Sequence, residues 1–306
     1  MVIINYAIMC LVFGTTFLTI KIGIDAGAPP FFSAGIRFFL AGLLLFVWMI
    51  LKKRARVNLL IQKEMMITGL CLTFGTFSTL YWAEQYVTSG AAAILSATAP
   101  MMILLLQMIV MREQVARKAL IGCLIGFLGV ILLVFPQVTM TASLFWLLGS
   151  GAILIGQLFY SSGALYSKQV IRRFADSSPV ALNAVQMMYG GAMLMILSFF
   201  TEPLHLSSML TPKAIGSLLY LIIIGSMVGH TIFYWLVAKT NPVFPSTWLY
   251  LSPVIAMGLG ALLYHETVTW FMALGAVTTI AGIVIVNFDS LRNLIKRQQR
   301  KELDLA

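Results

Sequence analysis

A stripe of polar side chains runs through an otherwise apolar segment near residue 230. Ser226, His230 and Tyr234 follow one another at intervals of four residues, so on a helix they share one face. Hydroxyl, imidazole and phenol groups form hydrogen bonds with small polar molecules. Among lipid-facing residues such groups are costly unless they have a partner or face a cavity. The stripe therefore predicts either a cavity that binds a small molecule or hydrogen bonds that join neighbouring helices.

Similar side chains occur in six of the apolar segments of the chain. Each bears a hydroxyl, amide, imidazole or indole group of the kind that orients a bound ligand. The candidate substrate-binding residues are Thr15, Thr19, Tyr81, Trp82, Ser96, Gln157, Tyr160, His230, Tyr234, Trp235, Tyr250 and Ser252. Tyrosine and tryptophan near the ends of membrane helices also act as interfacial anchors. The Tyr-Trp pairs at 81–82 and 234–235 are therefore part of the site, anchors, or gates at opposite mouths.

Two prolines interrupt apolar segments near their middles. Pro100 and Pro253 each remove a backbone donor and free a carbonyl one turn earlier, that of Ser96 and that of Leu249. Interruptions in corresponding membrane helices are typical of transporter binding sites. We predict that these prolines act as hinges next to the site. A static kink satisfied by neighbouring groups is the alternative.

Charged residues are rare within the apolar segments. Lys21 is expected to extend towards the interface, and Glu84 to pair with Lys21 or Arg37. No aspartate or glutamate lies deep in any segment, and the three cysteines show no paired spacing typical of a metal site. Intramembrane proteases use paired aspartates or an HExxH helix, and neither occurs. We therefore predict that the protein is not an enzyme and holds no metal and no cofactor. A neutral cavity with one cation near its mouth suits zwitterionic or uncharged metabolites.

The composition places the chain in a membrane. Of its 306 residues, 60% are hydrophobic and 10% charged, whereas soluble domains have roughly 45–50% apolar and about 25% charged residues. Such a chain has too little polar surface to cover a water-soluble globule, which excludes a soluble enzyme, a nucleic-acid-binding protein and a disordered chain. The net charge of +10 lies in short loops and in the C-terminal tail. The expected partners are a small-molecule substrate and membrane lipids, not nucleic acid.

Ten apolar segments are long enough to cross a bilayer, which takes about 20 residues of helix. They lie at about 3–23, 30–51, 64–83, 88–111, 116–136, 143–167, 179–200, 214–238, 244–264 and 268–288. Continuous apolar runs such as residues 41–47 lack the alternation of a barrel strand. We predict an all-α membrane protein with ten transmembrane helices.

The distribution of basic residues predicts how the chain is oriented. Seventeen of the 20 lysines and arginines lie in the even-numbered loops and the C-terminal tail. The odd-numbered loops contain only Lys213, and Lys21 and Arg37 lie within segments. Because cytoplasmic loops carry an excess of Lys and Arg, both termini are expected on the cytoplasmic side of the inner (cytoplasmic) membrane.

The second half of the sequence repeats the first. At a separation of 153 residues the matches are Tyr81 with Tyr234, Trp82 with Trp235, Pro100 with Pro253, Glu113 with Glu266, Gly122 with Gly275 and Gly129 with Gly282. At a separation of 149, Pro30 matches Pro179 and Gly42 matches Gly191. Because each copy has five spans, the second enters from the opposite face. The sequence thus predicts two inverted five-helix repeats, a plan typical of secondary transporters.

The repeats define three regions of the chain. Residues 1–138 form the first five-helix repeat, and residues 139–290 form the second. Residues 291–306 form a basic cytoplasmic tail, which is expected to bind anionic lipid headgroups. The glycines of the fifth and tenth spans allow close helix approach. They either brace the two halves or join two protomers in a homodimer.

Several short motifs are shared with a known family. They are the run Phe13-Gly14-Thr15-Thr16-Phe17 followed by Lys21, a proline followed by Arg37, and the series Glu113, Gly122, Gly129 with its second copy Glu266, Gly275, Gly282. In these features the chain resembles the EamA family of the drug/metabolite transporter superfamily over nearly its whole length. The resemblance implies a ten-helix inner-membrane carrier whose spans 1, 3, 4, 6, 8 and 9 surround a central cavity. One departure is Phe13, where the family often has tryptophan.

The repeat and the resemblance together predict secondary transport. We expect an exporter of small metabolites, such as amino acids or related compounds, that works by alternating access between an outward-open and an inward-open state. A channel or a lipid scramblase-like facilitator is the alternative. Saturation and trans-stimulation in counterflow distinguish a carrier from a pore.

Overall fold

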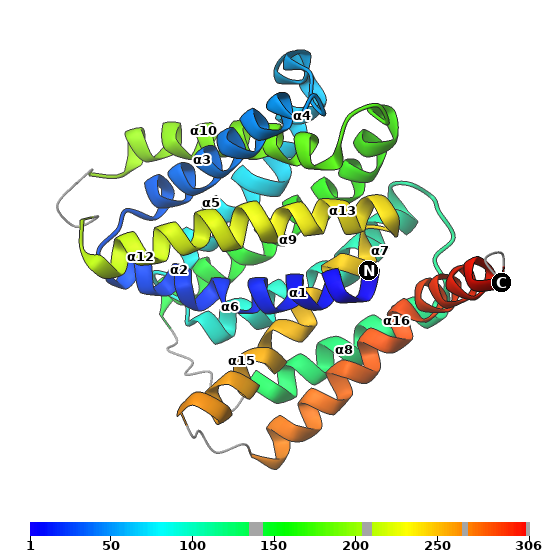
Figure 1. Cartoon of the computed structure of the whole chain (residues 1–306). Helices are drawn as coiled ribbons and strands as arrows, with labels where there is room; N and C mark the ends of the chain where they lie inside the picture. Colours follow the sequence, from blue (N-terminus) through cyan, green and yellow to red (C-terminus); the bar gives the residue numbers. More distant parts are fainter. Residues whose placement is uncertain (135–142, 204–209, 265–268, 304–306) are drawn as a thin grey trace.

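The structure, a computed structural model, describes residues 1–134, 143–203, 210–264 and 269–303. Within these ranges all regular secondary structure is helical and there is no strand (Figure 1). The predicted all-α class is confirmed. The predicted boundary between the two repeats, at residues 138 and 139, lies outside the described residues, as do Glu266 and the last three residues of the tail.

Eight helical stretches of the described chain are long and apolar enough to cross a membrane. Their elements are α1 (Val2–Gly14), α2 (Thr16–Asp25), α3 (Pro30–Leu51), α6 (Ser89–Ser96), α7 (Ala99–Ile109), α8 (Arg117–Val134), α9 (Leu144–Arg173), α10 (Pro179–Thr201), α12 (Pro212–Tyr220), η4 (Leu221–His230), α13 (Thr231–Lys239) and α16 (Trp270–Leu303). Pairs of elements in direct succession, such as α1 with α2 and α6 with α7, make up one stretch. The chain is therefore a multi-pass membrane protein.

The two remaining predicted spans are helical but do not belong to these eight. Residues 63–83 form α4 (Lys63–Thr68), η2 (Gly69–Gly75) and α5 (Thr76–Ala83), where several threonines dilute the apolar character. Residues 243–264 form α14 (Val243–Ser246) and α15 (Trp248–Tyr264), which are separated at Thr247. A short 3₁₀ helix, η1 (Val57–Ile61), precedes α4. The count of ten spans therefore stays a prediction.

Proline marks the beginning of three of the long helices. Pro30, Pro179 and Pro212 lie in the first turns of α3, α10 and α12. Proline suits this position because its fixed φ is helical and its missing N–H has no helical partner there. Ser178 also caps α10, since its hydroxyl accepts a hydrogen bond from the Val180 N–H at 3.3 Å. These local signals explain why the sequence predicted the helix starts closely.

Two stretches contain π-helical turns at related places in the two halves. Moving η2 by 153 residues gives 222–228, which falls within η4. π-helical turns are rare and frequently accompany functional sites. No feature of the hydropathy pattern predicted them.

The helices α3 and α10 form a closely packed pair (Figure 1). A Cβ atom on Gly35 would meet the carbonyl oxygen of Gly191. Their counterparts in the other half are Ala184 and Gly42, and a Cβ on Gly42 would meet the carbonyl oxygen of Ala184. Residues at equivalent positions of the two repeats therefore make this contact at two places along the helix pair.

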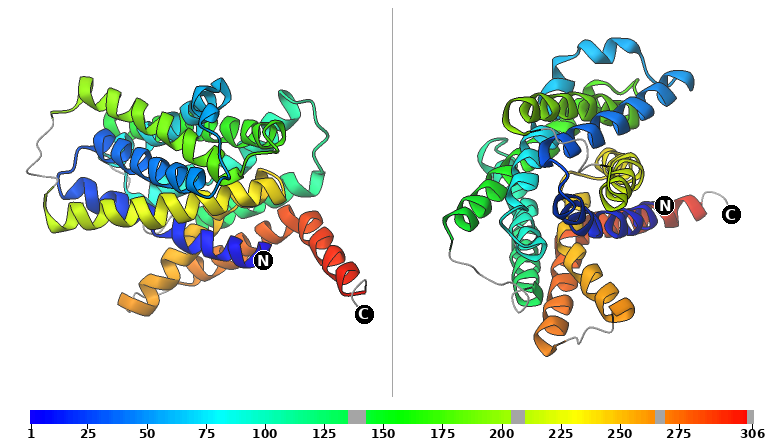
Figure 2. Two further views of the ribbon diagram at one scale, coloured as in Figure 1. Left: turned by 45° about the horizontal axis from the view of Figure 1, so that its top comes forward. Right: turned by 90° about the vertical axis from the view of Figure 1, so that its left-hand side faces the viewer.

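The helices α8 and α16 repeat this arrangement. Gly122 lies against the backbone of Val286, and Gly275 lies against that of Leu133. As residue numbers rise along one helix they fall along its partner, so the helices of the pair are antiparallel. The glycine stripes therefore brace helices of the same chain. The two closely packed pairs lie at opposite ends of the molecule, with α1 and α13 between them (Figure 2).

Candidate functional site

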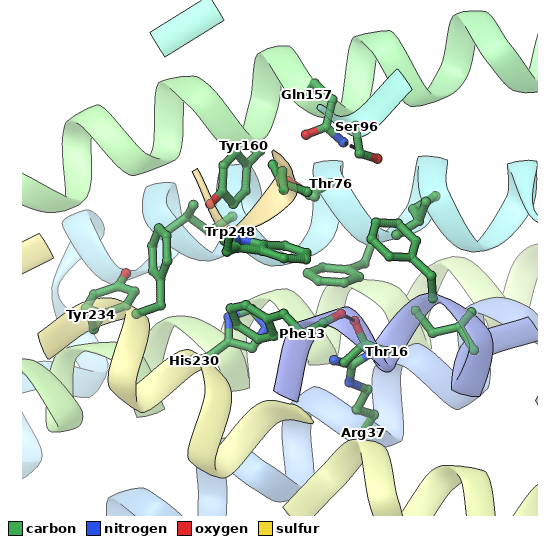
Figure 3. A pocket seen from close by; sticks show the side chains of 17 residues that line it. Phe13, Thr16, Arg37, Thr76, Ser96, Gln157, Tyr160, His230, Tyr234 and Trp248 are labelled. Atoms are coloured by element: carbon green, nitrogen blue, oxygen red, sulfur yellow. Dashed lines mark hydrogen bonds between the residues drawn. The ribbon is translucent and has the colours of Figure 1, made fainter. Parts of the chain in front are cut away.

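A buried cavity of about 50 Å³ lies among helices from both halves of the chain (Figure 3). Seven of the ten predicted spans contribute to its wall. The lining residues are Phe13, Thr16, Phe17, Ile20, Arg37, Leu72, Thr76, Phe77, Leu80, Ser96, Gln157, Tyr160, His230, Phe233, Tyr234, Trp248 and Leu249. The six spans implied by the family resemblance are all represented, and the second span adds Arg37. This volume holds a few water molecules.

Five of the predicted substrate-binding residues line this cavity. They are Ser96, Gln157, Tyr160, His230 and Tyr234, and they come from three different spans. The Gln157 amide donates a hydrogen bond to the Ser96 hydroxyl over 3.2 Å, and the Tyr160 hydroxyl donates to that of Ser246 over 3.2 Å. The structure therefore brings these distant residues together, whereas their role in binding stays a prediction.

Four other candidates make hydrogen bonds away from the cavity lining. Thr15 and Thr19 bond backbone carbonyls of their own helical stretch, and the Thr15 hydroxyl also lies 2.6 Å from that of Tyr220. The Tyr250 hydroxyl donates to the carbonyl oxygen of Cys123 over 3.2 Å. Tyr81 accepts a hydrogen bond from the wall residue Arg37. Thr15, Tyr81 and Tyr250 thus join neighbouring helices, whereas the bond of Thr19 stays within its own helical stretch, and a role of these residues in binding stays a prediction.

The last three candidates also lie outside the lining. Trp82 borders a separate pocket together with Tyr86, Ser252 borders another together with Pro253, and Trp235 is half-buried. Helical spacing showed only that these side chains share a helix face with other polar residues. It does not indicate which neighbouring helix or pocket that face contacts.

The two predicted hinge prolines differ in their setting. Pro100 lies in the first turn of α7, directly after the interruption between α6 and α7. Pro253 lies inside α15, and the interruption of that stretch comes earlier, at Thr247. Ser96 and Leu249, whose carbonyls the prolines free, both line the cavity. Hinge motion at either proline stays a prediction.

Three polar atoms on lining residues have no hydrogen-bond partner in the described part of the chain. They are His230 Nε2, the Tyr234 hydroxyl, which lies near the Thr68 side chain, and Trp248 Nε1, which lies near that of Tyr160, in both cases without the geometry of a hydrogen bond. In Figure 3, His230 and Phe13 lie between Tyr234 and Arg37, and Trp248 lies above them. Leaving a buried polar group unpaired costs roughly 1–3 kcal/mol. Such groups in a cavity wall are the expected partners of a ligand.

Aromatic rings form most of the remaining wall. The ring of Phe13 lies 4.6 Å from that of Trp248 and 5.1 Å from that of His230, and Phe77 lies 5.9 Å from His230. Sequence reasoning did not assign these phenylalanines to the site, because an aromatic residue in an apolar span does not stand out. The departure at Phe13 from the family pattern was the one signal that pointed here.

Arg37 is buried in the wall, with 1% of its surface exposed. Its Nε donates to the Ser226 hydroxyl over 2.9 Å, and its Nη1 donates to the Tyr81 hydroxyl over 3.1 Å. The guanidinium carbon lies 4.5 Å from the centre of the Phe38 ring and 5.3 Å from that of Phe77, which are cation–π distances. Arg37 is therefore held firmly at one end of the cavity.

The predicted ion pair of Glu84 is wrong. Lys21 pairs instead with Asp25 over 3.0 Å and donates to the backbone carbonyl oxygen of Glu84 over 3.0 Å. The carboxylate of Glu84 is buried, and neither oxygen has a hydrogen-bond partner among the described residues. An i,i+4 partner on the same helix was within easier reach of Lys21 than the Glu84 carboxylate. Among the residues searched, no group of three or more His, Cys, Asp or Glu is placed to hold a metal ion.

Comparison with known proteins places the chain among membrane transporters. The model of the EamA-like transporter family matches residues 1–135 and 147–288. The chain is 26% identical to an uncharacterized transporter of Bacillus subtilis, YoaV, over 93% of this chain and 96% of the relative. It is 28% identical to the uncharacterized inner membrane transporter YedA of Escherichia coli, over 90% and 87% of the two chains. These relatives are named as transporters, not as enzymes.

A solved crystal structure shares the fold. It superimposes with a TM-score of 0.76 at 15% sequence identity, covering 94% of this chain and 97% of that one. Similarity at this level extends to the arrangement of helices along almost the whole chain.

Proposed function

Because the chain belongs to the EamA-like transporter family, we propose that it exports small metabolites, such as amino acids or related compounds, across the cytoplasmic membrane by alternating access. The observation that carries this proposal is the enclosed cavity, whose wall holds three unpartnered polar atoms from spans 8 and 9. A metabolite that bonds to His230, Tyr234 and Trp248 would recover the free energy that these groups lose without a partner.

The reciprocal helix contacts support two inverted repeats, residues 1–138 and 139–290. The helices that correspond between the repeats, α3 with α10 and α8 with α16, pack antiparallel to each other, so equivalent helices run in opposite directions. A two-fold axis that relates antiparallel helices lies perpendicular to both of them. For helices that cross a bilayer, this axis lies in the membrane plane, as in transporters with inverted repeats.

Alternating access also explains the small size of the cavity. Sites for small molecules usually have volumes of roughly 300–1,000 Å³, whereas this one has about 50 Å³. The aromatic side chains therefore fill most of the site, and they must move before a metabolite enters. We propose that the structure represents a closed state between the two open states.

Ten spans with both termini in the cytoplasm are part of the proposal. Residues 63–83 form 21 residues of continuous helix, or about 30 Å at 1.5 Å per residue, which is the thickness of the apolar bilayer core. The tail after the tenth span would then face anionic headgroups of the inner leaflet.

Labelling of single cysteines tests this orientation. In a variant with Cys10, Cys71 and Cys123 replaced by alanine, we expect a membrane-impermeant maleimide added to intact cells to label Lys213→Cys but not Lys52→Cys. Both positions are exposed in the structure, so permeabilised cells should label both. Labelling of Lys52→Cys in intact cells would contradict the proposed orientation.

Removing the Tyr234 hydroxyl tests the proposed site. Since this hydroxyl lies near the Thr68 side chain but makes no well-formed hydrogen bond in the described chain, Tyr234→Phe should change stability little while the KM of counterflow in liposomes rises roughly three- to tenfold, the worth of one hydrogen bond. Wild-type protein should show saturation and trans-stimulation. A channel or scramblase-like facilitator shows neither.

Tyr250→Phe is the matched control for Tyr234→Phe. Its hydroxyl bonds the Cys123 carbonyl and Tyr250 is not a lining residue. This variant should lose about 1 kcal/mol of stability with no change in KM. If the two variants exchange these effects, the cavity is not the transport site.

A further inference from the structure

Arg37 makes no ion pair with a carboxylate in the described part of the chain, although the buried carboxylate of Glu84 acts on it at longer range. No ion pair joins it to a carboxylate, because Asp25 pairs with Lys21 and Glu84 neither bonds Arg37 nor lines the cavity. Buried charges in proteins are normally paired, since an unpaired one is costly. A carboxylate in direct contact with the guanidinium is therefore expected from a molecule that enters the cavity, since Glu84 acts only at longer range.

The guanidinium has donors left over for such a molecule. Of its five N–H groups, one on Nε and one on Nη1 are used by Ser226 and Tyr81. The three others, one on Nη1 and two on Nη2, make no hydrogen bond with described residues. Two of them, one on each Nη, match the planar, bidentate geometry of a carboxylate. The rings of Phe38 and Phe77 stabilise the cation without neutralising it.

The second half of the chain shows that the fold does not require this charge. Under the 149-residue separation the counterpart of Arg37 is Gln186, and under the 153-residue separation the counterpart of Ser226 is Thr73. These counterparts also meet, since the Thr73 hydroxyl donates to Gln186 Oε1 over 2.9 Å. A neutral amide thus satisfies the equivalent position. Of this pair of equivalent residues, Arg37 lines the cavity and Gln186 does not, so the positive charge occurs only at the position that faces the cavity.

From these observations we propose that the substrate is a small organic monocarboxylate with a flat apolar body. Its carboxylate is bound by Nη1 and Nη2 of Arg37, and its body lies among the rings of Phe13, Phe77 and Trp248. One buried cation balances one negative charge, so a doubly charged phosphate fits less well. No acidic side chain lines the cavity in the described chain, so an ammonium group finds no counter-ion. This inference rests on the proposed function and narrows its substrate class to acids without an amino group.

Binding to the purified full-length protein in detergent tests the proposal apart from transport. Phenylacetate, phenylacetamide, phenylethylamine and phenylalanine share one ring and differ in charge. We expect phenylacetate to quench tryptophan fluorescence and raise Tm with a Kd at least tenfold below those of the other three. Arg37→Gln, which introduces the residue found at 186, should remove this preference and retain the wild-type Tm without ligand. Lys213→Gln removes one exposed positive charge and should bind like wild type.

Each outcome of this experiment decides the proposal. If phenylacetamide or phenylethylamine binds the wild type as tightly as phenylacetate, or if folded Arg37→Gln keeps the preference, the assignment is overturned. Should Arg37→Gln not fold, the comparison of the four probes on wild type decides alone. Carboxylate binding without counterflow would leave this inference standing and refute the carrier. Counterflow without any preference for the carboxylate would support the carrier and overturn the assignment of a carboxylate substrate.

Discussion

Replacing Gly282 by alanine is expected to separate α8 from α16 and to destabilise the protein by about 1–3 kcal/mol, the usual cost of overpacking. A Cβ atom at this position would clash with the backbone nitrogen and Cα of Gly126. Backbone atoms in a helix have no alternative rotamer, so the two helices themselves must move apart. Chemical unfolding of purified protein in detergent, followed by tryptophan fluorescence, measures the loss.

The repeat supplies a second position at which the same loss is expected. Gly129 is the counterpart of Gly282, and a Cβ there would fall on the backbone nitrogen of Thr279. Gly129→Ala should therefore destabilise the protein by a similar amount. Gly151→Ala is the control, because a Cβ on Gly151 meets no atom within 4 Å. Alanine is the better helix former by about 1 kcal/mol, so this variant should be as stable as wild type or more so. If all three variants behave alike, close backbone contact does not hold the helices together.

The all-helical class and the helix starts were largely predictable from the sequence, because lipid imposes strong local constraints, whereas the count of ten spans stays a prediction. Each span must be apolar and about 20 residues long, and prolines such as Pro30 and Pro179 mark helix starts. The glycines of the fifth and tenth spans matched across the repeat, and in the structure Gly122 and Gly282 lie against each other. What hydropathy could not anticipate was the interior of the third span, where threonines and a π-helical turn face the protein.

The site was less predictable. The sequence shows which residues share one face of a helix, but it does not show which other helix packs against that face. A search for polar residues in apolar spans found Gln157 and His230, which line the cavity, and also Tyr250, which bonds a carbonyl elsewhere. The same search passed over Phe13 and Trp248, whose rings form the wall. Only the packing of distant spans separates these groups.

Charge was the least predictable feature of the site. From sequence, Arg37 was one of two cations that Glu84 was expected to pair with. In the structure Lys21 uses Asp25, which is four residues away on its own helix, and Arg37 has no carboxylate. Local pairs form at small entropic cost, and a sequence does not show which charge is left without one. The leftover cation is the strongest indication of what the cavity binds.

If one monocarboxylate crosses per cycle without a coupled ion, export should depend steeply on membrane potential. A potential of 100 mV, negative inside, is worth about 2.3 kcal/mol per charge, or a concentration ratio of roughly 50-fold. We expect liposomes that contain the protein, potassium and labelled phenylacetate to release the label faster when valinomycin in sodium buffer makes their interior negative. Reversing the potassium gradient should slow the release. Protein-free liposomes measure the leak of the neutral acid.

The potential dependence also bears on the direction of transport. Cells keep their interior negative, so an uncoupled carrier of a monoanion exports it without any further energy source. If phenylacetate is transported at a rate that does not respond to valinomycin, a second charge moves with it, and the prediction of uncoupled export is wrong. The buried groups available to carry a proton would then be His230 in the wall and Glu84, which does not line the cavity. Glu84→Gln and His230→Gln would identify which one by restoring the dependence on potential. Uncoupled export requires instead that Arg37 alone compensates the passing charge, so the same two variants should leave the response to potential unchanged.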